Sequence, residues 1–261
     1  MKGFYLLSVA MAFMPIAGAA IAAPAYSSLA QASDRDPEAM QALDRMGEAL
    51  RKRTAIEVRA DITSEEVLTT GQKLQHGGST HIVARTPNGF QVTIRTDRHQ
   101  RDIYYDGRKL TLFAPSLGYY ASFAAPSTIR ETLQVAADKY GLEIPLADMF
   151  AWGLDPQLQT RITSAIRVGS DAVNGQNCAH YAMRQAQVDW QIWIREGSDP
   201  LPCKLVITSR ADPAMPQHTA VYTWIDPKPM ETSSFTFTPP AGAHEIVFAP
   251  DLAAQAIKRG K

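Results

Sequence analysis

Histidine and cysteine can act as metal ligands or in catalysis, and their spacing in the sequence helps to decide between a metal site and a structural role. His76 and His81 have four residues between them, and the chain contains neither HxxxH nor Cys-x-x-Cys, the spacings typical of zinc ligands. His180 lies in an alternating, strand-like run, where a hydrogen-bonded structural histidine is more common than a catalytic base. We therefore expect no metal and no cofactor.

Nucleophilic catalysis also lacks its usual motifs. The sequence has no Gly-x-Ser-x-Gly turn and no glycine-rich phosphate loop. Asp34, Asp36 and Glu38 form an acidic cluster, but a helix that begins within this cluster explains it better, because carboxylates cap a helix N-terminus and complement its dipole. We predict a non-catalytic protein. An enzyme is the alternative, since carboxylates that are distant in the chain can meet in a cleft.

The most informative side chains are apolar residues that alternate with polar ones. In a strand every second side chain points to the same face, so the runs over 90–96, 188–195 and 203–209 each have one apolar face. The apolar positions are Phe90, Val92, Ile94, Trp190, Ile192, Ile194, Leu205 and Ile207. This face forms either a core packed beneath helices or the wall of a ligand cavity, and in a half-barrel the same face does both.

Two helices are predicted in the middle of the chain to cover that face. Thr128 and Glu131 form a capping box, and Gly141 ends the first helix. A second helix is expected to begin at Pro145 and to end before Gly153. The side chains that we expect to act as a lid are Ile129, Leu133, Tyr140, Leu146, Met149 and Phe150.

The rest of the chain is interpreted as one amphipathic helix followed by strands. Asp36 and Pro37 predict a helix start, and the apolar residues after them share one helical face until about Arg53. A period of two then begins near Ile56, which indicates sheet. Turn signals follow at 70–71, 77–78, 88–89, 106–107 and 174–175, and a last strand pair is expected over 220–225 and 234–238. The predicted fold is mainly β.

The N-terminus has the order of a secretory signal peptide. Lys2 precedes an apolar run over 4–23, and small residues follow it. Two cleavage sites compete, before Ala23 and before Ser33, and we favour the second. An uncleaved membrane anchor is the alternative. We predict export to the periplasm.

The predicted domain organisation is a signal peptide over 1–32, a single domain over 33–250 and a short basic tail over 251–261. The chain has 26 basic and 26 acidic residues, so no net charge attracts nucleic acid. We expect a monomer with no nucleic-acid partner.

Export also bears on the two cysteines, Cys178 and Cys203, because an oxidising compartment favours a disulfide. A simple three-stranded meander over 176–209 would place them two strands apart, about 9–10 Å, which is too far for a bridge. Both lie near turn signals, where the chain can leave the sheet. The sequence predicts the bridge and leaves its geometry open.

Three segments carry a resemblance to a known family. They are Asp189-Trp190-Gln191-Ile192-Trp193-Ile194, Pro200-Leu201-Pro202-Cys203-Lys204-Leu205-Val206-Ile207-Thr208 and Phe235-Thr236-Phe237-Thr238-Pro239-Pro240. Over residues 36–248 the chain resembles an uncharacterised family of predicted periplasmic proteins that is grouped with the outer-membrane lipoprotein carriers of the LolA, LolB and LppX type. The resemblance implies an incomplete antiparallel β-barrel whose concave face is covered by an N-terminal helix and two central helices and holds acyl chains. No short motif of the established carriers occurs here, so no functional residue is carried over.

The sequence therefore predicts a periplasmic binding or carrier protein for a lipid, a lipoprotein acyl chain or another apolar molecule. The mechanism would be a lid equilibrium, in which the central helices move away when a ligand supplies the missing contacts. The alternative is an interaction or regulatory module whose groove binds a protein partner, including a transient partner at the membrane.

Overall fold

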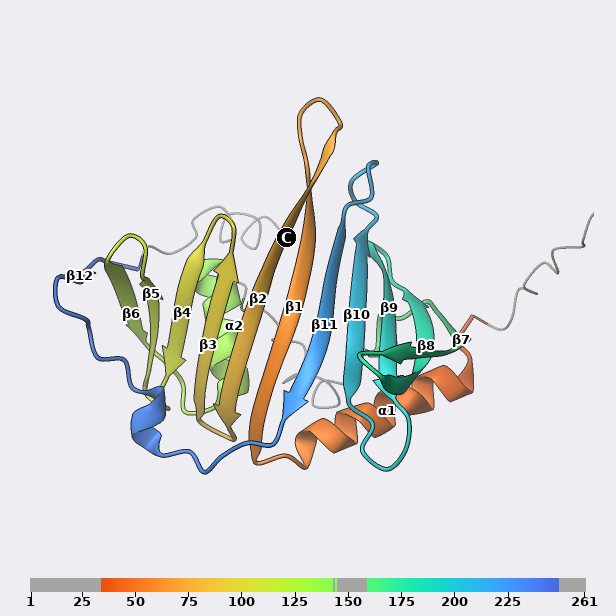
Figure 1. The fold of residues 1–261 in the computed structure, drawn as a ribbon, viewed down its shortest axis with the longest axis horizontal. Helices are drawn as coiled ribbons and strands as arrows, with labels where there is room; N and C mark the ends of the chain where they lie inside the picture. Colours follow the sequence, from red (N-terminus) through yellow and green to blue (C-terminus); the bar gives the residue numbers. More distant parts are fainter. Residues whose placement is uncertain (1–33, 143, 145–158, 249–261) are drawn as a thin grey trace, which may run out of the picture. The chain divides into compact units, whose positions relative to one another are not determined.

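The computed structural model describes residues 34–142, 144 and 159–248 (Figure 1). Its helices are α1 (Pro37–Arg51), α2 (Ile129–Tyr140) and the short 3-10 helix η1 (Thr232–Phe235). Its strands are β1 (Ala55–Val67), β2 (Lys73–Arg85), β3 (Gly89–Thr96), β4 (Gln100–Tyr105), β5 (Lys109–Ala114), β6 (Tyr119–Ala124), β7 (Ser164–Val173), β8 (Gln176–Arg184), β9 (Val188–Arg195), β10 (Pro202–Ser209), β11 (Gln217–Ile225) and β12 (His244–Glu245).

Three predicted segments lie outside the described residues. They are the signal peptide over 1–32, the second central helix with Leu146, Met149 and Phe150, and the basic tail over 251–261. Within the part of the chain that is described, no helix has the length and apolarity needed to cross a bilayer.

One sheet holds all twelve strands, in the order β12-β6-β5-β4-β3-β2-β1-β11-β10-β9-β8-β7. Strands β1 to β6 form one antiparallel meander and β7 to β11 form another, and the two join where β11 pairs with β1, with Tyr222 opposite Ala60. The short β12 adds to β6 in parallel. Since β12 and β7 are the two edges of this order, the sheet is open, and the predicted mainly β, incomplete barrel is confirmed.

Two of the three predicted helices lie within the described residues, and both form where their capping residues indicate. At α1 the Asp36 carboxylate accepts the backbone N–H of Glu38 at 2.8 Å, and Pro37 opens the first turn. At α2 the Thr128 hydroxyl accepts the backbone N–H of Glu131, and Gly141 ends the helix in the left-handed conformation with φ 60°. The ends of these helices are set locally, because caps satisfy backbone groups that the helix itself leaves unpaired.

One predicted turn is wrong. Gly77 and Gly78 lie inside β2, which runs without a break to Arg85. A side chain on Gly78 would place its Cβ only 2.6 Å from the backbone oxygen of Arg95 in β3. Glycine at this position allows the neighbouring strand β3 to approach closely. A Gly-Gly pair in the sequence does not reveal whether it serves such an approach or a turn.

The strand predicted over 234–238 is also wrong. This segment begins as η1 and then runs along the first meander, where aromatic packing replaces ladder hydrogen bonds (Figure 1). Phe235 is buried against Gly89, and the Phe237 ring lies 5.1–5.3 Å from the rings of Tyr104, Phe113 and Tyr120. The alternation of Phe and Thr marks side chains that pack onto the sheet.

The predicted disulfide between Cys178 and Cys203 is present, with a Cα–Cα distance of 6.7 Å. The meander order β8-β9-β10 that argued against it is also present. The two findings agree because the register of β10 shifts between Pro202 and Lys204, which leaves Cys203 as an extra residue in a bulge. Bulged residues depart from the regular strand spacing, so the distance expected for an ideal sheet does not apply.

Candidate ligand-binding face

The residues predicted to wall a cavity all point to one face of the sheet, which we call the inner face. Cross-strand pairing shows this: Trp190 lies opposite Ile207 and Ile192 opposite Leu205. Directly opposite residues of paired strands share a face. Leu205 is in turn opposite Ala220, which connects this row to β1 and through β2 to Phe90, Val92 and Ile94 of β3.

The inner face is divided between two hydrophobic clusters, each beneath a different helix. Phe90, Val92 and Ile94 are buried in a cluster with Ile129 of α2, and the half-buried Leu133 and Tyr140 pack against it. Trp190, Ile192 and Ile194 belong to a second cluster, with Leu43, Met46 and Leu50 of α1. Helix α1 thus packs on the second meander, in line with the N-terminal helix that was expected to share in covering the concave face. In the sequence, the apolar stripe of α1 indicates that this helix packs on an apolar face.

Between the two clusters lies a strip of apolar side chains that are only half-buried, which we call the seam. It consists of Ile62, Leu205, Ile207 and Trp224. Leu205 and Trp224 pack against both clusters. Ala220, the residue opposite both Leu205 and Ile62, is small and is itself fully buried. Trp224 was not predicted, because its place depends on the pairing of β11 with the distant strand β1.

One end of the seam carries polar groups. Ser64 Oγ lies 2.7 Å from Nδ1 of His218, which is directly opposite it on β11 and also opposite Ile207 on β10. Burial lowers the pKa of His218, so the ring is neutral at physiological pH. A serine and a histidine alone do not make a catalytic triad, and among the described residues no carboxylate is hydrogen-bonded to this ring.

A second histidine stands beside this pair. His76, opposite Ser64 on β2, is hydrogen-bonded to Asp97 at 2.8 Å and to Glu66 at 3.1 Å. The hydrogen bond to Asp97 raises the pKa of His76. The described ranges contain no group of three or more histidine, cysteine or acidic side chains placed to hold a metal ion. These side chains supply hydrogen bonds and charge at the rim of the face.

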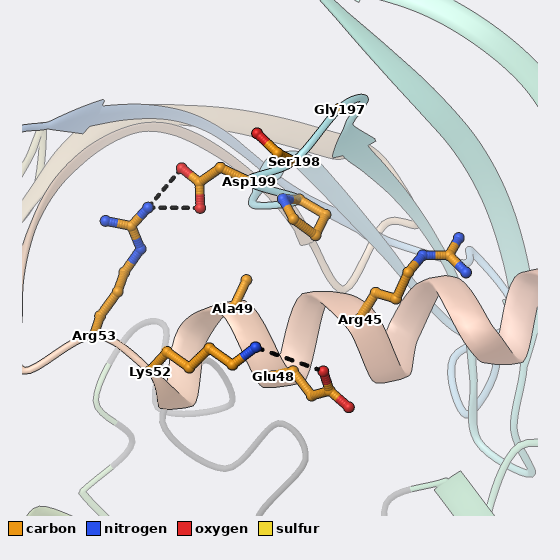
Figure 2. Close-up of a pocket in the computed structure, with 9 residues that line it drawn as sticks. Arg45, Glu48, Ala49, Lys52, Arg53, Gly197, Ser198 and Asp199 are labelled. Carbon is orange, nitrogen blue, oxygen red and sulfur yellow. Dashed lines mark hydrogen bonds and ion pairs between the residues drawn. The ribbon is translucent and has the colours of Figure 1, made fainter.

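A pocket of about 530 Å³ lies at the other end of the seam, where α1 ends (Figure 2). Its wall combines the last turns of α1 with the loop between β9 and β10. The lining residues are Arg45, Glu48, Ala49, Lys52, Arg53, Gly197, Ser198, Asp199 and Pro200. Arg53 pairs with Asp199 through contacts of 2.6 and 2.8 Å, and its guanidinium lies over the Trp224 ring at 5.8 Å. The pocket therefore adjoins the seam through Arg53.

Solved structures with a similar chain path include three bacterial proteins. An uncharacterized conserved protein from Thermus thermophilus is 9% identical at a TM-score of 0.47, over 80% of this chain and 99% of that one. The Mycobacterium tuberculosis lipoprotein LppX is 12% identical at a TM-score of 0.47, over 75% of this chain and 100% of that one. LprF from Mycobacterium bovis is 11% identical at a TM-score of 0.40, over 81% and 100% of the two chains.

No curated protein sequence matches this chain. A family model does, over residues 39–249, and its description is "Predicted periplasmic protein (DUF2092)". The match covers most of the 261 residues and confirms both the predicted family resemblance and the predicted periplasmic location. The chain belongs to this family of predicted periplasmic proteins.

Proposed function

We propose that the protein binds and carries a lipid, an acyl chain or another apolar molecule in the periplasm, without transforming it. The seam is the observation that carries this proposal. It places Leu205 and Trp224 half-buried between two helix-covered clusters of one continuous face. Full burial of an exposed leucine is worth about 1.5–3 kcal/mol, so covering the part of Leu205 that is still exposed would contribute a fraction of that to the binding of an alkyl chain.

The two helices differ in what they would do when a ligand binds. Helix α1 is joined to the sheet by hydrogen bonds as well as by packing, because the backbone of Asp36 pairs with Ala165 at 2.8 Å. Helix α2 is held by the packing of Ile129 in the first cluster, by the stacking of Tyr140 on Phe123 at 4.4 Å, and by one backbone hydrogen bond from Ile129 to Pro87 at 2.8 Å. Our proposal is that α2, with Ile129, Leu133 and Tyr140, is the movable lid and α1 the fixed one. A ligand shifts such an equilibrium by its difference in affinity for the two states.

The test is a fluorescence titration of the mature protein with a dodecyl-chain ligand, paired with mass spectrometry of molecules released from the native protein by denaturation. Wild type should give a saturable change in tryptophan emission, and the change should disappear in Trp224→Phe. Leu205→Glu places a carboxylate in the seam and should weaken binding by at least tenfold, because the ligand would have to desolvate a charge.

A matched control is available on the opposite face. Val221 is also half-buried and apolar, but it lies opposite Lys204 on the outer face, so Val221→Glu should leave binding within twofold of wild type. Equal loss in both variants, with both still folded, would contradict the seam as the site. Release of a stoichiometric protein segment, with no saturable alkyl binding, would overturn the carrier proposal in favour of an interaction module.

A further inference from the structure

The pocket at the end of α1 has the construction of an anion site. Its volume of about 530 Å³ lies within the range of small-molecule sites. Figure 2 shows Arg53, just after the end of α1, paired with Asp199, and Arg45 on the helix with its guanidinium directed away from that pair. The walls come from a helix and a strand connection that are themselves tied together by the Arg53–Asp199 pair.

Positive charge exceeds negative charge in and beside this pocket. The lining cations are Arg45, Lys52 and Arg53, and the lining acids are Glu48 and Asp199. Beside the pocket Arg195 is balanced by Glu196, so the excess is one positive charge. Asp199 is shared, since both Arg53 and Arg195 bond to its carboxylate. The surplus is local, because the whole chain has no net charge. The excess charge favours an anion, while the C-terminal end of the α1 dipole opposes one.

Two of the arginines retain unused donors. Arg45 has no ion pair within the described part of the chain, and Arg53 Nε is buried there without a hydrogen-bond partner. A buried donor without an acceptor is costly, so an acceptor that fits beside it would be favoured. The planar fork of a guanidinium matches the oxygens of a phosphate or a carboxylate.

The pocket also connects to the inner face in two places. Arg53 lies over Trp224, a seam residue, at 5.8 Å. A smaller neighbouring pocket of about 200 Å³ shares Arg45 with the first and is lined on its other side by Ile194 and Tyr181 of the inner face. In that pocket Arg167 is paired with Glu38 at 3.1 Å, and a second acid, Glu196, accepts a hydrogen bond from Ser170. A ligand with one charged end and one alkyl chain would fit a charged pocket that adjoins an apolar face.

We propose that the pocket at the end of α1 binds the anionic oxygen group, phosphate or carboxylate, of an amphipathic ligand whose alkyl chain lies on the seam. This inference rests on the proposed carrier function. Arg45 and Arg53 contact the anion, and the Arg53–Asp199–Arg195 cluster holds the loop over 196–200 in place. This proposal narrows the ligand class from apolar molecules in general to amphipathic molecules with one anionic head group and an alkyl chain.

The experiment compares dodecyl phosphate, dodecanoate and dodecanol, which share one chain and differ in charge, at pH 8. Wild type should bind dodecyl phosphate and dodecanoate at least tenfold more tightly than dodecanol, and the ratio should fall as salt rises from 50 to 500 mM. Arg45→Gln should reduce the ratio to threefold or less by weakening the binding of the two anionic compounds. The matched control is Arg51→Gln, which removes the same charge from an exposed position of α1 that lines neither pocket.

The outcomes separate this inference from the proposed function. Equal affinity of wild type for all three compounds would overturn the anion pocket and leave the carrier function standing. Absence of binding by all three would overturn the carrier function and, with it, the proposed amphipathic ligand. A titration with inorganic phosphate alone distinguishes the source of the anion. If phosphate shifts the arginine side-chain resonances while no dodecyl compound binds, the anion site is supported and its link to a lipid is overturned.

Discussion

At the scale of single residues, two histidines at the rim of the inner face respond to pH in opposite directions. The hydrogen bond to Asp97 raises the pKa of His76, while burial lowers the pKa of His218. Both start from an ordinary value of 6.5. His76 stabilises the fold when it is protonated, whereas His218 does so when it is neutral.

The signs follow from linkage between protonation and folding. The contribution of His76 is fully present below pH 6.5 and is lost as the pH rises through its raised pKa; that of His218 is lost as the pH falls from 6.5 through its lowered pKa. We expect NMR titration of the ring resonances to place the midpoint of His76 above 6.5 and that of His218 below it. His76→Gln should flatten the alkaline side of the stability profile and His218→Gln the acidic side. The reverse assignment would contradict the contacts described for both rings.

At the scale of elements, the disulfide joins β8 to β10 across the end of β9. The bonded residues are 25 positions apart in the sequence. A loop of that length restricts the unfolded chain enough to stabilise the fold by roughly 3 kcal/mol. The double variant Cys178→Ala/Cys203→Ala should therefore lose about that much free energy of unfolding in urea. Wild type under reducing conditions should match the variant, and two reactive thiols in denatured, unreduced wild type would contradict the bridge.

Elements with local signals were predicted well, and elements set by distant partners were not. Asp36 and Gly141 mark helix ends because the backbone groups that they satisfy are a few residues away. Gly78 and Cys203 depend on a neighbouring strand and on a bulge, which neither composition nor spacing reveals. The alternation of Phe235 and Phe237 indicated a strand, but their aromatic partners are on the first meander.

At the scale of the whole molecule, the pairing of β1 with β11 makes the two meanders into one face. Alternation in the sequence was enough to place Phe90, Ile192 and Leu205 on apolar faces. It was not enough to show that these faces are continuous, or that two different helices cover them, because both facts depend on strand order. The seam at Trp224 can therefore be identified only when the strand order is known.

The most direct test of alkyl binding at the seam is photolabelling with a dodecyl-chain fatty acid that carries a diazirine near the end of its chain. We predict saturable labelling that maps to the seam, at Leu205, Trp224 and their neighbours on β10 and β11, and that an excess of unlabelled dodecanoate prevents. Labelling of the outer face at Val221 instead, or labelling that does not saturate, would contradict the claim that an alkyl chain binds between the two helix-covered clusters.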